Sequence, residues 1–184
     1  MRIVWLVFLG LLMAMAIALP RLSHPYGAPK TLVLAAPRAS TFASLRTAPP
    51  FTRADSVVAF GLAQQGTPYT YAGVSPITGF DCSGFIMYTF ARFNVAVPHS
   101  TALLITVGRP VPRAEAQPGD IVVFTGTAET STTPGHAGIV ISRRGELPLR
   151  FVHASSARRE PFVKVSQVET TDYERRFMQV RRVL

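Results

Sequence analysis

The sequence predicts an α+β domain in which N-terminal helices pack on an antiparallel sheet of about five to six strands. Apolar residues recur near helical spacing in the segment 54–65, and a second apolar run follows Cys82. Strand-like segments occupy the chain after Asp120. Helices that come first and strands that come afterwards are typical of this fold class.

The helical part contains two longer helices and one short helix. The first is expected over residues 54–65. The second begins at Cys82, with Asp81 as its cap, and runs to about residue 93. The third begins behind the cap residue Ser100. The expected strands that follow are 121–124, 136–142, 149–154, 162–166 and 177–183.

The N-terminus has the features of an export signal. Met1-Arg2 precedes an apolar run from Ile3 to Leu19, which Pro20 ends. Ala16-Ile17-Ala18 is a small-x-small cleavage site, whereas an uncleaved run would serve as an anchor. A chain of 184 residues with 48% apolar content can bury one good core. The predicted parts are a signal peptide or membrane anchor (1–19), a basic Pro/Ala-rich linker or arm (20–53) and a catalytic-sized domain (54–184).

The positive charge is concentrated before this domain. The formal net charge is +9, and no acidic residue occurs before Asp55. Six of the 19 basic residues precede Ala54, which leaves 13 against 10 acidic residues in the remainder. The arm suits a membrane surface or an anionic wall polymer, or it is a solvated tether. Nucleic acid is not an expected partner, because no nucleic-acid-binding signature accompanies the charge.

The single cysteine lies in the stretch Gly79-Phe80-Asp81-Cys82-Ser83-Gly84. One cysteine excludes an intrachain disulfide and a multi-cysteine zinc site. A helix start presents free N–H groups, which favour a thiolate, so we expect a lowered pKa for this thiol. The alternative for a lone cysteine is a buried structural residue.

Two histidines are expected to lie close together on a hairpin. His136 opens one strand-like segment and His153 lies in the next. A turn centred on Arg144 and Gly145 would place the two imidazoles directly opposite each other. Because Pro148 allows a longer loop, the sequence predicts approximate adjacency only.

These residues supply the parts of a thiol enzyme. A cysteine attacks, one imidazole takes its proton, and a further polar group orients that ring. Two histidines and one cysteine would also suit zinc, but the surrounding sequence lacks the H-x-E or C-x-x-C context of such sites. Neither a metal nor an organic cofactor is therefore expected.

From about Ala54 to its end, the chain resembles the NlpC family of cell-wall cysteine peptidases, which have a papain-like fold. The segments that carry the resemblance, in chain order, are Gly66-Thr67-Pro68-Tyr69, 79–85, Pro98-His99-Ser100-Thr101, Pro118-Gly119-Asp120, 136–139, 152–155 and Arg181-Arg182-Val183. Their order and spacing extend over essentially the whole domain. Two departures are Ala72-Gly73, where the family often has Gly-Gly, and a longer segment between the histidines.

The resemblance implies a role for six residues. It implies Cys82 as nucleophile, His136 as base and His153 as the residue that orients the base. It also implies that Tyr69, Asp81 and Ser83 line the substrate or oxyanion site. His99 is expected to be a surface neighbour of a helix cap rather than a catalyst.

The sequence therefore predicts an exported, monomeric cysteine peptidase, periplasmic or associated with the cell envelope. It would hydrolyse amide bonds in peptidoglycan stem peptides or crosslinks through an acyl-enzyme. One alternative is a related Cys/His amidase or acyltransferase. The other is a catalytically silent wall-binding module. Which amide bond is cut does not follow from the sequence.

Overall fold

The computed structural model describes residues 51–184. The predicted signal peptide or anchor (1–19) lies outside these residues, as does nearly all of the predicted arm (20–53). Among the helices of residues 51–184, none combines the length and the apolar character that crossing a bilayer requires.

The first helix begins at a capping box. The Thr52 hydroxyl accepts a hydrogen bond from the Asp55 N–H at 3.1 Å, and the Asp55 carboxylate accepts one from the Thr52 N–H at 2.8 Å. Each residue thereby satisfies a backbone N–H that the helix itself cannot, so the helix starts at Arg53. The helical elements are α2 (Arg53–Leu62), α3 (Cys82–Ala91), α4 (Thr101–Leu104), the 3-10 helix η2 (Arg113–Glu115) and α5 (Asp172–Arg176).

The strands form a two-stranded hairpin and a six-stranded antiparallel sheet. The hairpin pairs β1 (Val74–Ser75) with β2 (Gly79–Phe80). The order in the large sheet is β3-β8-β4-β5-β6-β7, all antiparallel. The predicted α+β class and strand number of the large sheet are confirmed, and the sequence analysis missed its strand β3 and both strands of the hairpin. The strands of the large sheet are β3 (Arg109–Val111), β4 (Ile121–Thr125), β5 (Pro134–Val140), β6 (Arg150–Ala154), β7 (Val163–Gln167) and β8 (Phe177–Arg182).

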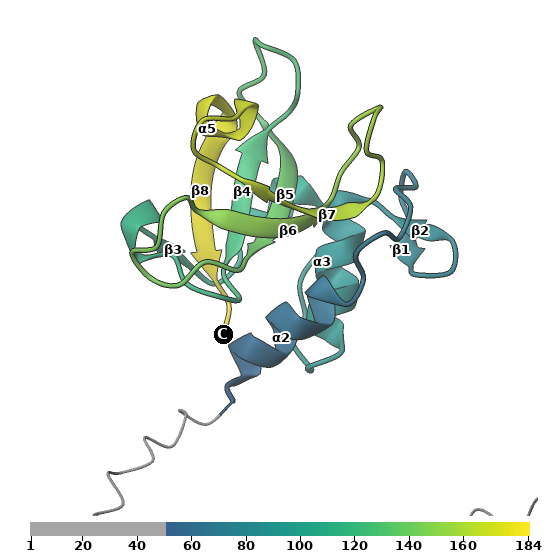
Figure 1. Cartoon of the computed structure of the whole chain (residues 1–184), viewed down its shortest axis with the longest axis horizontal. Helices are drawn as coiled ribbons and strands as arrows, with labels where there is room; N and C mark the ends of the chain where they lie inside the picture. The colour runs from purple at the N-terminus through teal and green to yellow at the C-terminus, as the bar shows by residue number, and fades with distance from the viewer. Residues whose placement is uncertain (1–50) are drawn as a thin grey trace, which may run out of the picture. The chain divides into compact units, whose positions relative to one another are not determined.

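Alternation along β5 separates two cores. Ala137 and Ile139 belong to the core that α2 and α3 cover, on one side of the sheet (Figure 1). Val140 belongs to a second core with Phe124 and Phe151. Because successive side chains of a strand point to opposite faces, His136 lies on the face of this second core. The His136 imidazole therefore lies on the face of the sheet opposite to the one that α2 and α3 cover.

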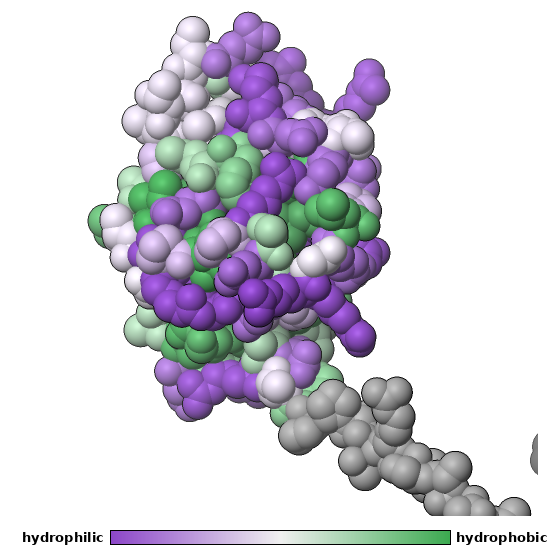
Figure 2. Space-filling model, turned by 90° about the vertical axis from the view of Figure 1, so that its left-hand side faces the viewer, coloured by the Kyte–Doolittle hydropathy of each residue, from purple (hydrophilic) through white to green (hydrophobic). Residues whose placement is uncertain are grey.

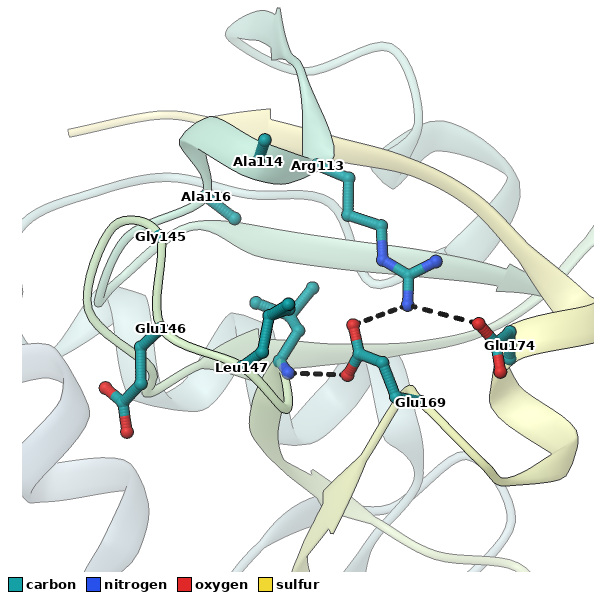
Figure 3. Close-up of a pocket in the computed structure, with 9 residues that line it drawn as sticks. Arg113, Ala114, Ala116, Gly145, Glu146, Leu147, Glu169 and Glu174 are labelled. Carbon is teal, nitrogen blue, oxygen red and sulfur yellow. Dashed lines mark hydrogen bonds and ion pairs between the residues drawn. The ribbon is translucent and has the colours of Figure 1, made fainter.

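The connection between β5 and β6 is held to neighbouring segments by Glu169. The Glu169 carboxylate accepts hydrogen bonds from Arg113 Nη2 at 2.6 Å and from the Leu149 N–H at 2.6 Å (Figure 3). These contacts border a cavity of about 420 Å³ that none of the predicted site residues lines. On the face drawn in Figure 2, hydrophilic side chains separate the apolar residues into patches.

A buried ion pair joins the turn before β4 to the C-terminal strand. Arg182 Nε and Nη2 each donate to Asp120 at 2.7 Å, and the Gln117 N–H donates to the same carboxylate at 3.0 Å. Asp120 is 1% exposed. Removing one partner would leave a buried charge without its counterion, which is costly.

We expect Arg182→Gln to lower the free energy of unfolding of the full chain by about 3 kcal/mol, because Asp120 stays buried without its ion pair. The matched control is Arg144→Gln, which breaks an exposed pair with Glu115 and should cost about 0.5 kcal/mol or less. Urea unfolding measures both values. Equal losses in the two variants would contradict a structural role for the buried pair.

Candidate active site

The thiol of Cys82 stands in the first turn of α3. Asp81 is the N-cap of this helix, and its carboxylate accepts a hydrogen bond from the Gly84 N–H at 2.6 Å. Cys82 is 8% exposed. The cap therefore fixes the helix start that presents the sulfur.

Gly84 allows this helix start to lie against the β1–β2 segment. A Cβ atom at Gly84 would stand 2.1 Å from the carbonyl oxygen of Gly73, which is too close for any side chain. The Asp81 N–H donates to that same carbonyl at 3.0 Å. The small residue two positions after the thiol is thus required by a backbone approach.

The surroundings of the sulfur correct one sequence-based expectation. Burial raises the pKa of the Cys82 thiol and the Asp81 carboxylate adds to this, whereas the Thr101 hydroxyl and the N–H groups of Ala137 and Ser83 oppose it. The lowered pKa that we predicted from the helix start is therefore wrong, because desolvation outweighs the donors around the sulfur. Thr101 Oγ1 lies 3.5 Å from Cys82 Sγ. These surroundings favour the protonated thiol over the thiolate.

The two predicted histidines are in contact. His136 Nε2 lies 2.7 Å from His153 Nδ1, and both side chains are buried. The pairing of Ile139 with Val152 shifts the register by two residues from a hairpin centred on Arg144 and Gly145. An even shift keeps both rings on one face, so they meet diagonally rather than directly opposite each other.

A glycine lies across the strand pair from His153. The observed register extends to a pairing of His153 with Gly138. A Cβ atom at Gly138 would come within 2.5 Å of the Phe151 ring and 3.1 Å of the His153 Cβ atom. The absent side chain leaves the space through which the His153 ring reaches His136.

A serine continues the hydrogen-bonded series beyond the histidines. His153 Nε2 lies 3.0 Å from the Ser166 hydroxyl on β7. If His153 Nε2–H donates to Ser166, then His153 Nδ1 accepts from His136 Nε2–H. That tautomer leaves His136 Nδ1 unprotonated and able to accept a proton. Burial lowers the pKa of His136 to about 3, with Arg176 as a second cause, so the ring is neutral.

An aromatic residue from α5 packs on both imidazoles. The Tyr173 ring stacks on His136 with centroids 5.7 Å apart and meets the His153 ring edge-on at 5.5 Å. The guanidinium of Arg176 lies 5.3 Å from the centroid of the Tyr173 ring. Burial raises the pKa of Tyr173 to about 12. Tyr173 thus packs against both imidazoles at once.

Three further predicted residues lie around the start of α3. Tyr69 is half-buried, and burial raises its pKa, with the neighbouring Cys82 and Asp81 as the next causes. The Ser83 hydroxyl donates to Asp81 Oδ1 at 3.1 Å. His99 Nε2 lies 3.0 Å from both carboxylate oxygens of Asp81. The Asp81 carboxylate therefore contacts the backbone of the helix start, the Ser83 hydroxyl and the His99 ring at the same time.

The site thus brings the predicted residues into two connected groups. His136 and His153 are in hydrogen-bond contact, and the N–H of Ala137, the residue next to His136, lies close enough to Cys82 to lower the pKa of its thiol. Tyr69, Asp81 and Ser83 surround the helix start. Within residues 51–184, no cluster of three or more His, Cys, Asp or Glu side chains could hold a metal ion.

Three residues of the site were missed from the sequence. Thr101 follows Ser100, which was expected to cap α4 through its side chain but makes no such hydrogen bond. Ser166 ends a predicted strand and carries no local signal of its role. Tyr173 lies on the five-residue helix α5, whose signals are the cap residue Thr171 and acidic residues in the first turn.

Curated relatives match this part of the chain. A probable endopeptidase of Mycobacterium tuberculosis is 42% identical over 86 residues, which are 47% of this chain and 20% of that protein. The probable endopeptidase NlpC of Escherichia coli is 33% identical over 120 residues, 64% of this chain and 70% of that protein. The match thus spans only about a fifth of the mycobacterial relative's length.

Solved structures share the fold. An NlpC/P60 family protein from Bacillus cereus has a TM-score of 0.62 and 26% identity, over 73% of this chain and 41% of that one. The peptidoglycan hydrolase RipB of Mycobacterium tuberculosis has a TM-score of 0.56 and 26% identity, over 71% of this chain and 64% of that one. The family model described as NlpC/P60 matches residues 66–182. The sequence-based resemblance is confirmed, and the chain belongs to the NlpC/P60 family.

Proposed function

We propose that the chain is an exported cysteine peptidase that hydrolyses amide bonds in peptidoglycan stem peptides or crosslinks. The observation that carries the proposal is a series of contacts from Ser166 to His153 and from His153 to His136. His136 precedes Ala137 on β5, and the Ala137 N–H lies near enough to Cys82 to lower the pKa of its thiol. Nucleophile, base and orienting groups are then all present. The substrate class is supported by RipB, a peptidoglycan hydrolase with this fold.

The reaction begins with a neutral pair. Cys82 Sγ attacks the amide carbonyl carbon while its proton passes to His136 Nδ1, the ring nitrogen that His153 does not occupy. The C–N bond of the tetrahedral intermediate breaks, and His136 gives this proton to the leaving amine. Water then loses a proton to His136 and attacks the thioester, which releases the carboxylic acid and restores the thiol.

The carbonyl oxygen needs donors while it carries negative charge. The Ser83 N–H faces the sulfur from the start of α3, where backbone N–H groups lack helical partners. The Tyr69 hydroxyl is the second donor, since its raised pKa keeps it protonated.

The location of the enzyme is part of the proposal. Export rests on the apolar run at 3–19, and residence in the envelope agrees with the peptidoglycan substrate. The basic arm at 20–53 would keep the enzyme near anionic wall or membrane, or act as a tether. Monomeric action is proposed for the whole chain.

We expect Cys82→Ala to reduce cleavage of purified muropeptides at least ~1000-fold, because the nucleophile is lost. Fragment masses from the full chain identify the bond that is cut. Hydrolysis yields a new carboxylic acid, whereas transfer of the acyl group to another acceptor would indicate the acyltransferase alternative. Binding without fragments from the unaltered chain would indicate a wall-binding module, and cleavage by Cys82→Ala would refute the nucleophile.

The low pKa of His136 predicts activity well into the acidic range. The base must be neutral to accept the thiol proton, and a pKa of about 3 keeps it neutral as pH falls through the ordinary value of 6.5. The raised pKa of Cys82 keeps the thiol protonated on the alkaline side. We therefore expect kcat/KM to vary by about twofold or less between pH 5.5 and 8.

The control for this pH profile is recovery of activity after return to pH 7. The unfolded chain binds protons at imidazoles below pH ~6.5, whereas folded His136 does not, so stability falls as pH falls in this range. Full recovery of activity at pH 7 would show that any loss at low pH came from titration of groups in the folded protein and not from irreversible unfolding. An acidic limb centred near pH 6.5 would contradict the neutral, buried base.

We expect Ser166→Ala to lower kcat about tenfold with little change in KM, because His153 loses the partner that fixes its tautomer. Ser166→Thr keeps a hydroxyl and should retain most of the activity. Ser56→Ala on α2 is the matched serine control outside the site. An unchanged kcat for Ser166→Ala would remove the serine from the catalytic series.

A further inference from the structure

A second cavity begins at the proposed base. It has a volume of about 520 Å³, and its lining includes Gly135, His136, Ser155, Lys164, Tyr173 and Arg176. Tyr69, Asp81 and Ser83 do not line it. Figure 1 shows α5 and the β6–β7 connection near the end of the sheet where β5 begins. His136 therefore borders a cavity that these residues at the start of α3 do not line.

The order of the proposed reaction decides which half of the substrate meets this cavity. The acyl half stays bonded to Cys82, whereas the leaving amine receives its proton from His136. The leaving amine must then lie within hydrogen-bond reach of that imidazole. The cavity that His136 itself lines is thus on the leaving-group side, and this assignment rests on the proposed function.

Buried donors line the wall of the cavity. Arg176 is 5% exposed, and three of its N–H groups are used, two on the Thr125 carbonyl and one on Asp172. A guanidinium has five N–H groups, so two remain for a ligand. Ser155 is 1% exposed and accepts a hydrogen bond from the Ala157 N–H, which leaves its own O–H proton available.

The rim adds positive charge. Lys164 lines the cavity and is paired with Glu160. The exposed Arg158 and Arg159 follow the lining residues 155–157, and neither forms an ion pair within residues 51–184. Two carboxylates also lie here: Asp172 lines the cavity and pairs with Arg176, and Glu160 pairs with Lys164. Cavity and rim together thus hold four cationic side chains against two carboxylates. An anionic group in this place would gain charge-assisted hydrogen bonds.

We propose that this cavity binds a carboxylate of the residue that leaves with the amine. Arg176 and Ser155 supply buried donors, and Lys164, Arg158 and Arg159 supply the surrounding positive charge. The enzyme would then prefer peptides whose leaving residue carries a free carboxylate over peptides in which that group is an amide. The preference should weaken as salt screens the rim charges.

The first experiment compares two synthetic stem peptides that differ only in whether the carboxyl group of the leaving residue is free or amidated. We expect the full chain to cleave the free acid with a kcat/KM about tenfold higher. The double variant Arg158→Gln/Arg159→Gln should lose most of this preference through KM. Arg92→Gln/Arg109→Gln removes two exposed cations elsewhere, one at the end of α3 and one on the opposite edge strand β3, and should keep it.

The second experiment separates this proposal from the proposed function. The Cys82→Ala full chain is titrated calorimetrically with lysine, whose carboxylate is free, and with lysine amide. Tighter binding of the acid, lost in the added Arg158→Gln/Arg159→Gln change, supports the carboxylate site even if no peptide is cleaved. Equal binding of acid and amide, or equal kcat/KM for the two stem peptides, overturns it.

Discussion

The hydrogen bond between His136 Nε2 and His153 Nδ1 is the contact on which the rest of the site depends. It requires two adjacent strands in a register that keeps both rings on one face. It also requires Gly138, because a side chain there would occupy the space next to His153. The pairing of β5 with β6 therefore decides whether His136, the proposed base, can contact His153.

Burial determines the charge state of this site. A helix start and several N–H donors favour a thiolate, yet the sulfur is shielded well enough for desolvation to raise the pKa of Cys82. The same shielding, together with the positive charge of Arg176, lowers the pKa of His136. Thiol and imidazole are consequently both neutral at rest. In the proposed reaction, charge separates only when substrate is present, at the moment when the donors around the carbonyl oxygen can stabilise it.

The sequence predicted much of the fold and the reactive groups because these depend on local patterns. Helix caps such as Asp81, alternating strands and the spacing of the cysteine and histidines could all be read from neighbouring residues. The register shift of β5 and β6 could not, because the loop around Pro148 decides it. Ser166 and Tyr173 were missed for a related reason, since each acquires its role only through contact with side chains of another strand. The family's usual glycine at position 72 is explained by the backbone, as Ala72 has a φ of 56°.

The two sides of the base are built from different parts of the chain. In the proposed reaction, the start of α3 and the segment before it hold the nucleophile and would carry the acyl group. The proposed leaving-group side is formed by the beginning of β5, by the β6–β7 connection and by α5. Substitutions in the exposed residues 156–160 can alter the charge of this second side without moving Cys82, His136 or His153. Selectivity for the leaving residue can therefore change while the chemistry of the thiol and the imidazoles stays the same.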